Sequence, residues 1–318
     1  MPGNRRLRIL VAGTTCVAFL FFGTQSGLAH ESALPLCAWL HEARTLPWDV
    51  ILFENSTEFP IHLITDKFVG SDTKIISVKV GPEVMGWPVT RARLFVAILN
   101  ARTLEWCGPL GGPVDVLEDF CRFFRCKAMV DGGVWADLDD EESREQFLRH
   151  RMSKRASWPR EGEGVPTRQL LPPGHHSFYD DYLAMCRDNP EYSGLRDGSF
   201  LCDLSQNPRK RRRCGPWLPT LARSSMMCCL TASSDRSQLL TPTEVDIAHG
   251  WPCLSRLCPD AFAALAAYKS NLSDSARRTL AGNGMHLAAF SAFVLYIASH
   301  SERLPAASAM DRQCAACA

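Results

Sequence analysis

The segment RRLRILVAGTTCVAFLFFGTQSGLAH, residues 5–30, supports two interpretations that lead to different folds. Its arginines, the apolar run over residues 9–22 and the small residues at 27–29 are typical of a secretory signal peptide. The same run is typical of a strand that is buried on both faces and continues into a loop with Cys16. The segments that follow favour the strand, because they continue the pattern that it begins.

The composition is that of a folded protein without a dominant charge. The chain has 318 residues, of which 46% are apolar and 22% are charged. A net charge of +1 provides no overall field that attracts nucleic acid, so such binding depends on local patches. The apolar run over 9–22 is shorter than the ~20 residues of a membrane span, and we expect no membrane association.

The cysteines are numerous but do not form a recognisable metal motif. There are 14 of them, and the CxxC at Cys314 and Cys317 has no second half-site. Because a structural zinc site needs four ligands, we expect no metal. Small secreted scaffolds are denser in cysteine, which indicates reduced thiols in an intracellular protein.

Residues 7–55 predict a β–α–β unit. RLRILVAG and WDVILFEN are apolar on both faces, as in strands of a parallel sheet. Between them, SALPLCAWLHEA has the spacing of a helix that buries Leu34, Cys37 and Leu40. In such units ligands lie beyond the carboxyl ends of the strands, so we expect Cys16 and Glu54 on the same rim of the sheet.

The remaining chain predicts a hairpin, an irregular region and two late helices. TKIISVKV (73–80) and RARLFVAIL (91–99) are expected to pair as strands. From about 100 to 238 the periodicity is weak, and the segment contains the basic runs RHRMSKR (149–155) and RKRRR (209–213). AFAALAAYKSNL and GMHLAAFSAFVLYIASH predict apolar helices, the second of which is expected to cover the sheet.

Six short motifs follow one another along the chain. They are TTCVAFLFFGTQSG, FENS, VTRARLF, PTLARSS, LTPTEVDIAHGWP and AGNGMHLAAF. In order and rough spacing they resemble the motifs of the DNA cytosine-5 methyltransferase family, from its catalytic-cysteine loop to its C-terminal Gly-Asn motif. The resemblance implies an α/β fold with a partial Rossmann-like methyltransferase sheet lobe and a smaller, irregular target-recognition lobe.

The resemblance also implies a set of site residues. It places Cys16 at the catalytic nucleophile, Glu54 at the carboxylate that binds cytosine, and Arg91 and Arg93 at the arginine motif. The implied cofactor is S-adenosylmethionine, and the implied partner is double-stranded DNA in the nucleus. The cofactor-binding residues carried over are Gly282 and Asn283. The expected phosphate contacts come from the second basic run, Arg209, Lys210, Arg211, Arg212 and Arg213.

The chain departs from the family pattern at several points. Thr15 and Val17 stand where the family has Pro and Gln beside the nucleophile, Val89 stands for the Gln of the arginine motif, and Ser56 stands for Val. The first family motifs, which form most of the cofactor cradle, have no counterpart. The activity therefore depends on a separate chain or an upstream segment that supplies them; the alternative is a non-catalytic nucleic-acid-binding remnant.

The implied chemistry assigns a role to each catalytic residue. A thiolate that adds to C6 of cytosine turns the ring into an enamine, whose C5 then attacks a methyl sulfonium. A carboxyl beside N3 lowers the barrier to that addition, and a nearby arginine lowers the pKa of the thiol or binds O2 of the ring. The target base must leave the helix stack to reach these groups.

Three regions are predicted, together with one alternative from another functional class. Residues 1–100 form the catalytic lobe, 101–260 the target-recognition region, and 261–318 helices that return to the catalytic lobe. Cys16, Glu54 and Arg93 are expected to converge in a cleft between lobes. The alternative is a secreted glycoprotein whose signal peptide is followed by the acceptor sites Asn55-Ser-Thr and Asn271-Leu-Ser.

Overall fold

The computed structural model divides the chain into two compact units. The first comprises Met1–Val84, Ala92–Arg125 and Ala288–Ala318, and the second comprises Met85–Arg91 and Cys126–Leu287. The residues that the structure describes are 6–14, 27–70, 72–127, 130–136, 138, 141–152, 166–188, 200–209, 214–222, 224–231, 237–251, 259–269 and 271–305.

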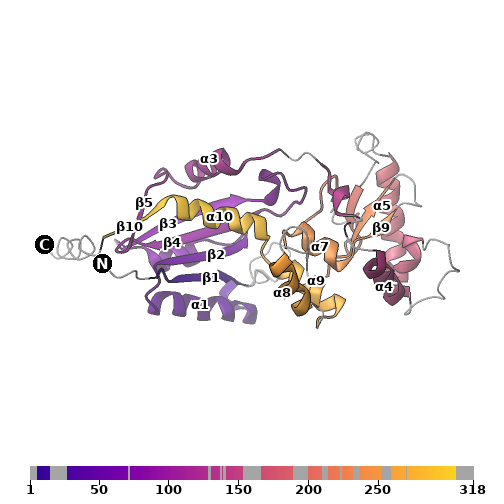
Figure 1. Ribbon diagram of the computed structural model, residues 1–318, viewed down its shortest axis with the longest axis horizontal. Helices are drawn as coiled ribbons and strands as arrows, with labels where there is room; N and C mark the ends of the chain where they lie inside the picture. Colours follow the sequence, from indigo (N-terminus) through magenta and orange to yellow (C-terminus); the bar gives the residue numbers. More distant parts are fainter. Residues whose placement is uncertain are drawn as a thin grey trace. The chain divides into compact units, whose positions relative to one another are not determined.

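The first unit is built on a four-stranded mixed sheet (Figure 1). Its strands are β1 (Ile9–Gly13), β2 (Val50–Ser56), β3 (Thr73–Val80) and β4 (Arg93–Asn100), in the order β1-β2-β4-β3. β1 and β2 are parallel, and β4 is antiparallel to both of its neighbours. The expected α/β fold, the first strand and the hairpin are therefore confirmed. The first strand is not buried on both faces as expected, because β1 lies at the edge of the sheet and exposes Ile9 and Val11.

Helix α1 (Leu34–Thr45) packs on one face of this sheet. The helix was predicted, but its buried side was wrong: Leu36, Trp39 and Ala43 are buried, whereas Leu34 and Cys37 are exposed. The segment has apolar residues on more than one side, and the side with the largest ring faces the sheet. The rings of Trp39 and Phe53 lie 4.8 Å apart, centroid to centroid. Helix α2 (His62–Phe68) adds Ile64 and Phe68 to the same cluster.

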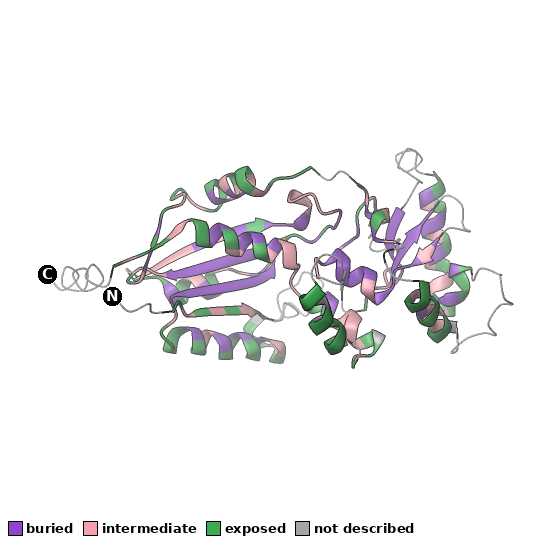
Figure 2. Ribbon diagram, in the orientation of Figure 1, coloured by how far each residue is buried: buried purple, intermediate pink, exposed green. Residues whose placement is uncertain are grey.

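Helix α10 (Leu287–Ser299) packs on the opposite face. The rings of Phe293 and Phe95 lie 5.4 Å apart, and Phe95 belongs to the strand β4 that Figure 2 shows as buried along most of its length. The expectation that the helix after Asn283 covers the sheet is thus confirmed. Helix α3 (Pro113–Phe124) packs beside β3, and β5 (Leu104–Trp106) pairs with β10 (Ser301–Arg303).

The apolar stretch Ser275–Ser299 is long and apolar enough to cross a membrane by length and composition alone. In the structure it consists of two helices, α9 (Asp274–Asn283) and α10, which belong to different units. The buried residues of α10 face the sheet of the first unit, as expected for the core helix of a folded domain.

The second unit contains a small antiparallel sheet in the order β7-β6-β8-β9. Helix α5 (His176–Asp188) packs on it through Tyr182, which is fully buried. The strands are β6 (Phe200–Asp203), β7 (Cys214–Gly215), β8 (Met227–Leu230) and β9 (Gln238–Leu239). The other helices are α4 (Glu141–Met152), α7 (Pro242–Ala248) and α8 (Pro259–Lys269), together with α9. Short 3-10 helices lie at Gly27–Ala29, Glu31–Ala33 and Pro82–Val84 in the first unit and at Gly132–Trp135, Thr167–Leu170 and Pro173–His175 in the second.

The boundaries of the two units differ from those expected from the sequence. Helix α3, inside the expected recognition region, belongs to the first unit, because the hydroxyl of Tyr296 on α10 donates a hydrogen bond to Asp119 of α3 (3.0 Å). Helices α8 and α9, expected to return to the catalytic lobe, belong to the second unit. The segment Met85–Arg91, between β3 and β4, also belongs there, since it is held by backbone hydrogen bonds such as Thr90 to Leu218 (2.8 Å).

Candidate functional site

Glu54 and Arg93 form a largely buried ion pair at one edge of the first sheet. Glu54 lies near the carboxyl end of β2, directly opposite Gly13 at the end of β1. Arg93 begins the antiparallel strand β4, so its side chain reaches the same edge. Arg93 Nε is 3.1 Å from Glu54 Oε1, and the two side chains are 16% and 9% exposed. The structure thus brings together two of the predicted catalytic residues.

Asn55 connects this pair to the chain that leads into the cysteine loop. Its side-chain amide donates hydrogen bonds to the carbonyl oxygen of Thr14 (3.1 Å) and to the hydroxyl of Thr14 (3.3 Å). Thr14 precedes Cys16 by two residues; Cys16 itself lies outside the described residues. Thr14, the last described residue before this loop, is therefore held to the strand that carries Glu54.

The sequence analysis missed this role of Asn55 and considered the residue only as a glycosylation acceptor. Asn55 is 2% exposed and its amide nitrogen is engaged, which is incompatible with a surface acceptor site. Its position directly after Glu54, at the end of a buried strand, is the signal from which a polar contact at this edge could have been predicted. Asn271, the other acceptor considered, is exposed.

Arg91 lies in the second unit and is 2% exposed. Its guanidinium donates hydrogen bonds to three backbone carbonyls, those of Leu221 (3.2 Å), Gly282 (3.2 Å) and Gly284 (2.6 Å). These contacts hold the turn after α9 against the segment before β4. The prediction that Arg91 acts on the thiol therefore stays a prediction, whereas its described contacts are structural.

The residues assigned to the cofactor do not form a cradle in the described part of the chain. Asn283 is exposed in the last turn of α9, and the carbonyl of Gly282 accepts the hydrogen bond from Arg91. A methyl-donor site needs several convergent polar groups in a concave pocket, which these two residues do not provide.

Of the five residues proposed to contact phosphate, only Arg209 lies in the described part of the chain. Arg209 forms an exposed ion pair with Asp181 of α5 (3.0 Å), while Lys210, Arg211, Arg212 and Arg213 lie outside the described residues. The pKa of Arg209 is raised by its hydrogen bond to Asp181. In the first basic run, Arg149 pairs with Glu145 one turn earlier in α4 (2.5 Å).

Glu244, part of the motif LTPTEVDIAHGWP, has a structural role. It is fully buried at the start of α7 and forms a capping box with Thr241. Its carboxylate also accepts hydrogen bonds from Arg144 of α4 and from the backbone of Leu138 (3.2 Å). This carboxylate therefore joins α7 to α4 inside the second unit.

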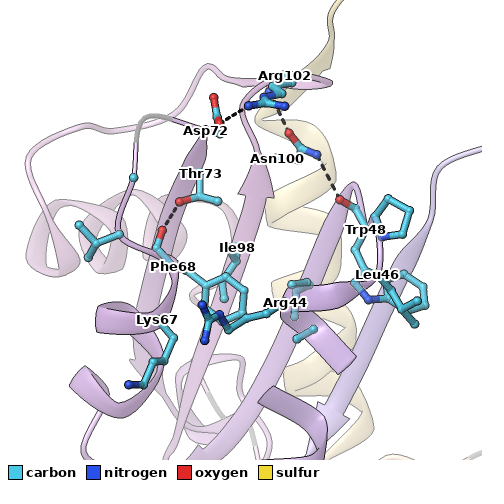
Figure 3. Close-up of a pocket in the computed structure, with 15 residues that line it drawn as sticks. Arg44, Leu46, Trp48, Lys67, Phe68, Asp72, Thr73, Ile98, Asn100 and Arg102 are labelled. Atoms are coloured by element: carbon cyan, nitrogen blue, oxygen red, sulfur yellow. Dashed lines mark hydrogen bonds and ion pairs between the residues drawn. The ribbon is translucent and has the colours of Figure 1, made fainter. Parts of the chain in front are cut away.

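A pocket among the described residues lies at the other end of the first sheet (Figure 3). It has a volume of about 460 Å³ and is bordered by the start of β2, the start of β3 and the end of β4. Arg102 pairs with Asp72 at its rim (2.5 Å), and Asn100 donates to the carbonyl of Trp48 (3.4 Å). Because Glu54 and Arg93 sit at the opposite ends of β2 and β4, this pocket is separate from the ion pair.

Comparison with known proteins shows similarity of fold only. No protein-family model and no curated protein sequence match the chain. Similar solved structures include the Entamoeba histolytica methyltransferase EhMeth (TM-score 0.48, 11% identity, 91% of this chain and 76% of that one). Others are the Dnmt2 methyltransferase of S. pombe (0.47, 12%, 90% and 77%) and a Spodoptera frugiperda DNMT2 mutant (0.45, 13%, 91% and 78%). The chain is similar to methyltransferases. At these identities and TM-scores the likeness assigns no activity or substrate.

Proposed function

We propose that this chain activates cytosine in double-stranded DNA for S-adenosylmethionine-dependent methylation at C5. The observation that carries the proposal is the pair Glu54–Arg93, held at 3.1 Å beside the end of β1, where the chain continues toward Cys16. The carboxylate and the guanidinium at this edge, together with the thiol of Cys16, are the groups that addition to a pyrimidine ring requires. The motif order of the sequence supports the same assignment.

In the proposed mechanism, Cys16 supplies the nucleophile and Glu54 supplies the proton at N3 of the cytosine ring. The Cys16 thiolate forms a bond to C6, the π electron pair of the C5–C6 bond moves to C4–C5, and the π electron pair of the C4–N3 bond moves to N3. Glu54, which pairs with Arg93 as a carboxylate, takes up a proton from solvent when the base binds and donates it from Oε2 to N3, where negative charge develops. Arg93 fixes Oε1 of Glu54 and adds positive charge beside the ring. Asn55 acts as a positioning residue, because it holds the backbone of Thr14 before the nucleophile.

The methyl donor is the remaining part of the proposal. S-adenosylmethionine would supply an electrophilic methyl group, but the described residues do not form its site. We therefore propose that a separate chain or an upstream segment completes it. Nuclear location is part of the same proposal, since the substrate is genomic DNA.

The activation step can be tested without the methyl donor. Addition at C6, protonation of C5 by solvent and elimination exchange the C5 hydrogen, so the full chain in D₂O should introduce deuterium at C5 of cytosines in duplex DNA. Cys16→Ser should abolish the exchange, and Glu54→Gln should slow it by a factor of about 10² to 10⁴. Cys37→Ser, which alters an exposed thiol on α1, is the matched control and should exchange at the parent rate.

The outcomes separate the two functional classes. Exchange that is unchanged in Cys16→Ser would exclude the covalent mechanism. Salt-dependent binding of duplex DNA without any exchange would identify a non-catalytic binding protein instead.

A further inference from the structure

Three cysteines form a row across the small sheet of the second unit. On the central strand β6, Cys202 lies directly opposite Cys214 of β7 on one side and Cys228 of β8 on the other. Residues in register share a face of the sheet, and all three belong to the cluster packed under α5. Cys186 of α5 joins the same cluster.

The backbone hydrogen bonds of the sheet distinguish the pair Cys202–Cys214 from the pair Cys202–Cys228. The backbone amide of Leu204 donates to the carbonyl of Met226 (2.9 Å), so these opposed residues form a hydrogen-bonded pair. Such pairs alternate along antiparallel strands, which makes Cys202–Cys228, two residues further along each strand, hydrogen-bonded as well.

It follows that Cys202 and Cys214 form the pair without backbone hydrogen bonds. A residue on a central antiparallel strand points its N–H and its C=O to the same side, and Cys202 points both toward β8. The Cα atoms of a pair without hydrogen bonds lie about 4.5 Å apart, against about 5.5 Å for a hydrogen-bonded pair. Both separations permit a disulfide, and the shorter one brings the side chains closer together.

The solvent exposure of the three cysteines also favours a disulfide between Cys202 and Cys214. Cys214 is partly exposed, whereas Cys202 and Cys228 are fully buried. Burial and a hydrogen bond with the Cys228 thiol raise the pKa of Cys202 well above its usual value. An oxidant that approaches this row from solvent therefore reaches Cys214 first, because it is the only one of the three thiols that is partly exposed.

We propose that Cys202 and Cys214 form a reversible disulfide by exchange with a low-molecular-weight disulfide such as oxidised glutathione. The Cys214 thiolate attacks one sulfur of glutathione disulfide, forms a mixed disulfide and releases one glutathione thiolate. Cys202 then attacks Sγ of Cys214, the mixed disulfide bond breaks, and the proton of Cys202 leaves with the second glutathione, which departs as a thiol. Two protein thiols are oxidised and one glutathione disulfide is reduced to two thiols.

The bond would span the segment that carries the second basic run. Cys202 and Cys214 flank residues 203–213, so the disulfide closes a loop that contains Arg209. Closing a loop restricts the conformations of the chain inside it. The two ends of this loop are already paired in the sheet, so the bond would act mainly by stabilising the folded second unit, and it does not depend on the proposed function.

The test is peptide mapping of the full-length chain after incubation with oxidised glutathione. Free thiols are alkylated, the protein is digested without reductant, and linked peptides are identified by mass. We expect a Cys202–Cys214 link, 2 Da lighter than the two reduced peptides, that disappears on treatment with dithiothreitol. Cys214→Ser should abolish the link and leave Cys202 reduced. Cys228→Ser should retain it, because the pair does not involve that thiol.

The exposed Cys37 on α1 reports whether the oxidant was effective, since it should form a mixed disulfide in every sample. A predominant link between Cys202 and Cys228, or between Cys186 and Cys214, would overturn the assignment. So would a reduced Cys202 under conditions that fully modify Cys37. If Cys214→Ser folds poorly, alkylation of the parent protein before and after oxidation serves instead. Protection of both Cys202 and Cys214 from alkylation after oxidation would support the disulfide, and continued alkylation of Cys202 would overturn it.

Discussion

Replacing Arg93 by methionine tests whether the ion pair with Glu54 stabilises the sheet edge at which the site is proposed. Methionine retains most of the aliphatic length of the arginine side chain but removes the guanidinium that lies 3.1 Å from Glu54 Oε1. Glu54 then keeps its negative charge at a position that is 7% exposed, without its cationic partner Arg93. We expect Arg93→Met to destabilise the first unit.

The magnitude follows from the burial of the pair. Removing one partner of a fully buried ion pair costs about 3–5 kcal/mol. Because 16% of the Arg93 side chain and 9% of the Glu54 side chain are exposed, solvent screens part of this loss. We therefore expect a free energy of unfolding lower by about 2–3 kcal/mol, on the scale that applies to buried pairs. Adding Glu54→Gln to Arg93→Met should recover part of the loss, since the double variant contains no unpaired buried charge.

Urea unfolding, followed by hydrogen exchange in peptides from β2 and β4, measures the effect in the first unit alone. The control is Arg102→Met, which removes an arginine from the exposed pair with Asp72 at the opposite edge of the same sheet and should leave the midpoint nearly unchanged. If the double variant loses as much stability as the sum of the two single variants, the charges do not interact and the assigned geometry is wrong.

Three further predictions address the packing, the pH response and the DNA contact. Phe293→Ala should lower the free energy of unfolding by about 3–5 kcal/mol, because it empties a fully buried site against Phe95; unchanged exchange rates in β4 would contradict the packing of α10. Burial and the hydrogen bond to Asp119 raise the pKa of Tyr296 above its usual value, so the native state holds its proton where the unfolded chain has lost it. Stability should therefore fall as the pH rises above about 10, and Tyr296→Phe should show a smaller fall in urea titrations at pH 9 to 11. The double substitution Arg209→Ala and Arg211→Ala should weaken duplex binding and reduce the slope of log affinity against log salt concentration by about 2. An unchanged slope would exclude phosphate contact by these two residues.

Much of the first unit could be predicted from the sequence, because its elements have strong local signals. Strands that are apolar on both faces, such as β2, favour the interior of a sheet, and the helix between β1 and β2 follows from the crossover rule. The equally apolar β1 is half-exposed because it lies at the edge, a place that was not encoded in its sequence. The same reasoning placed Glu54 at the carboxyl edge of the sheet, where the structure has it. The apolar helix α10 needed a sheet face to cover, and it covers one.

The second unit gave weaker signals for a physical reason. Its strands have two to four residues and carry cysteines at 202, 214, 228 and 229, so neither length nor alternation distinguishes them from loops. Their pairing is between segments distant in the sequence, which a local pattern does not encode. The row of opposed cysteines therefore became visible only through the register of the sheet.

The sequence by itself determined which residue types are available at the site: a thiol, a carboxylate and two arginines in a fixed order. Only the tertiary structure decided which of them meet. Arg93 and Arg91 are two residues apart and equivalent by pattern. Arg93 pairs with Glu54 in the first unit, whereas Arg91 belongs to the second unit and donates to three backbone carbonyls of that same unit. The physical reason is that a guanidinium is satisfied equally by a carboxylate or by carbonyl oxygens. Which of these acceptors it meets depends on the packing of distant segments.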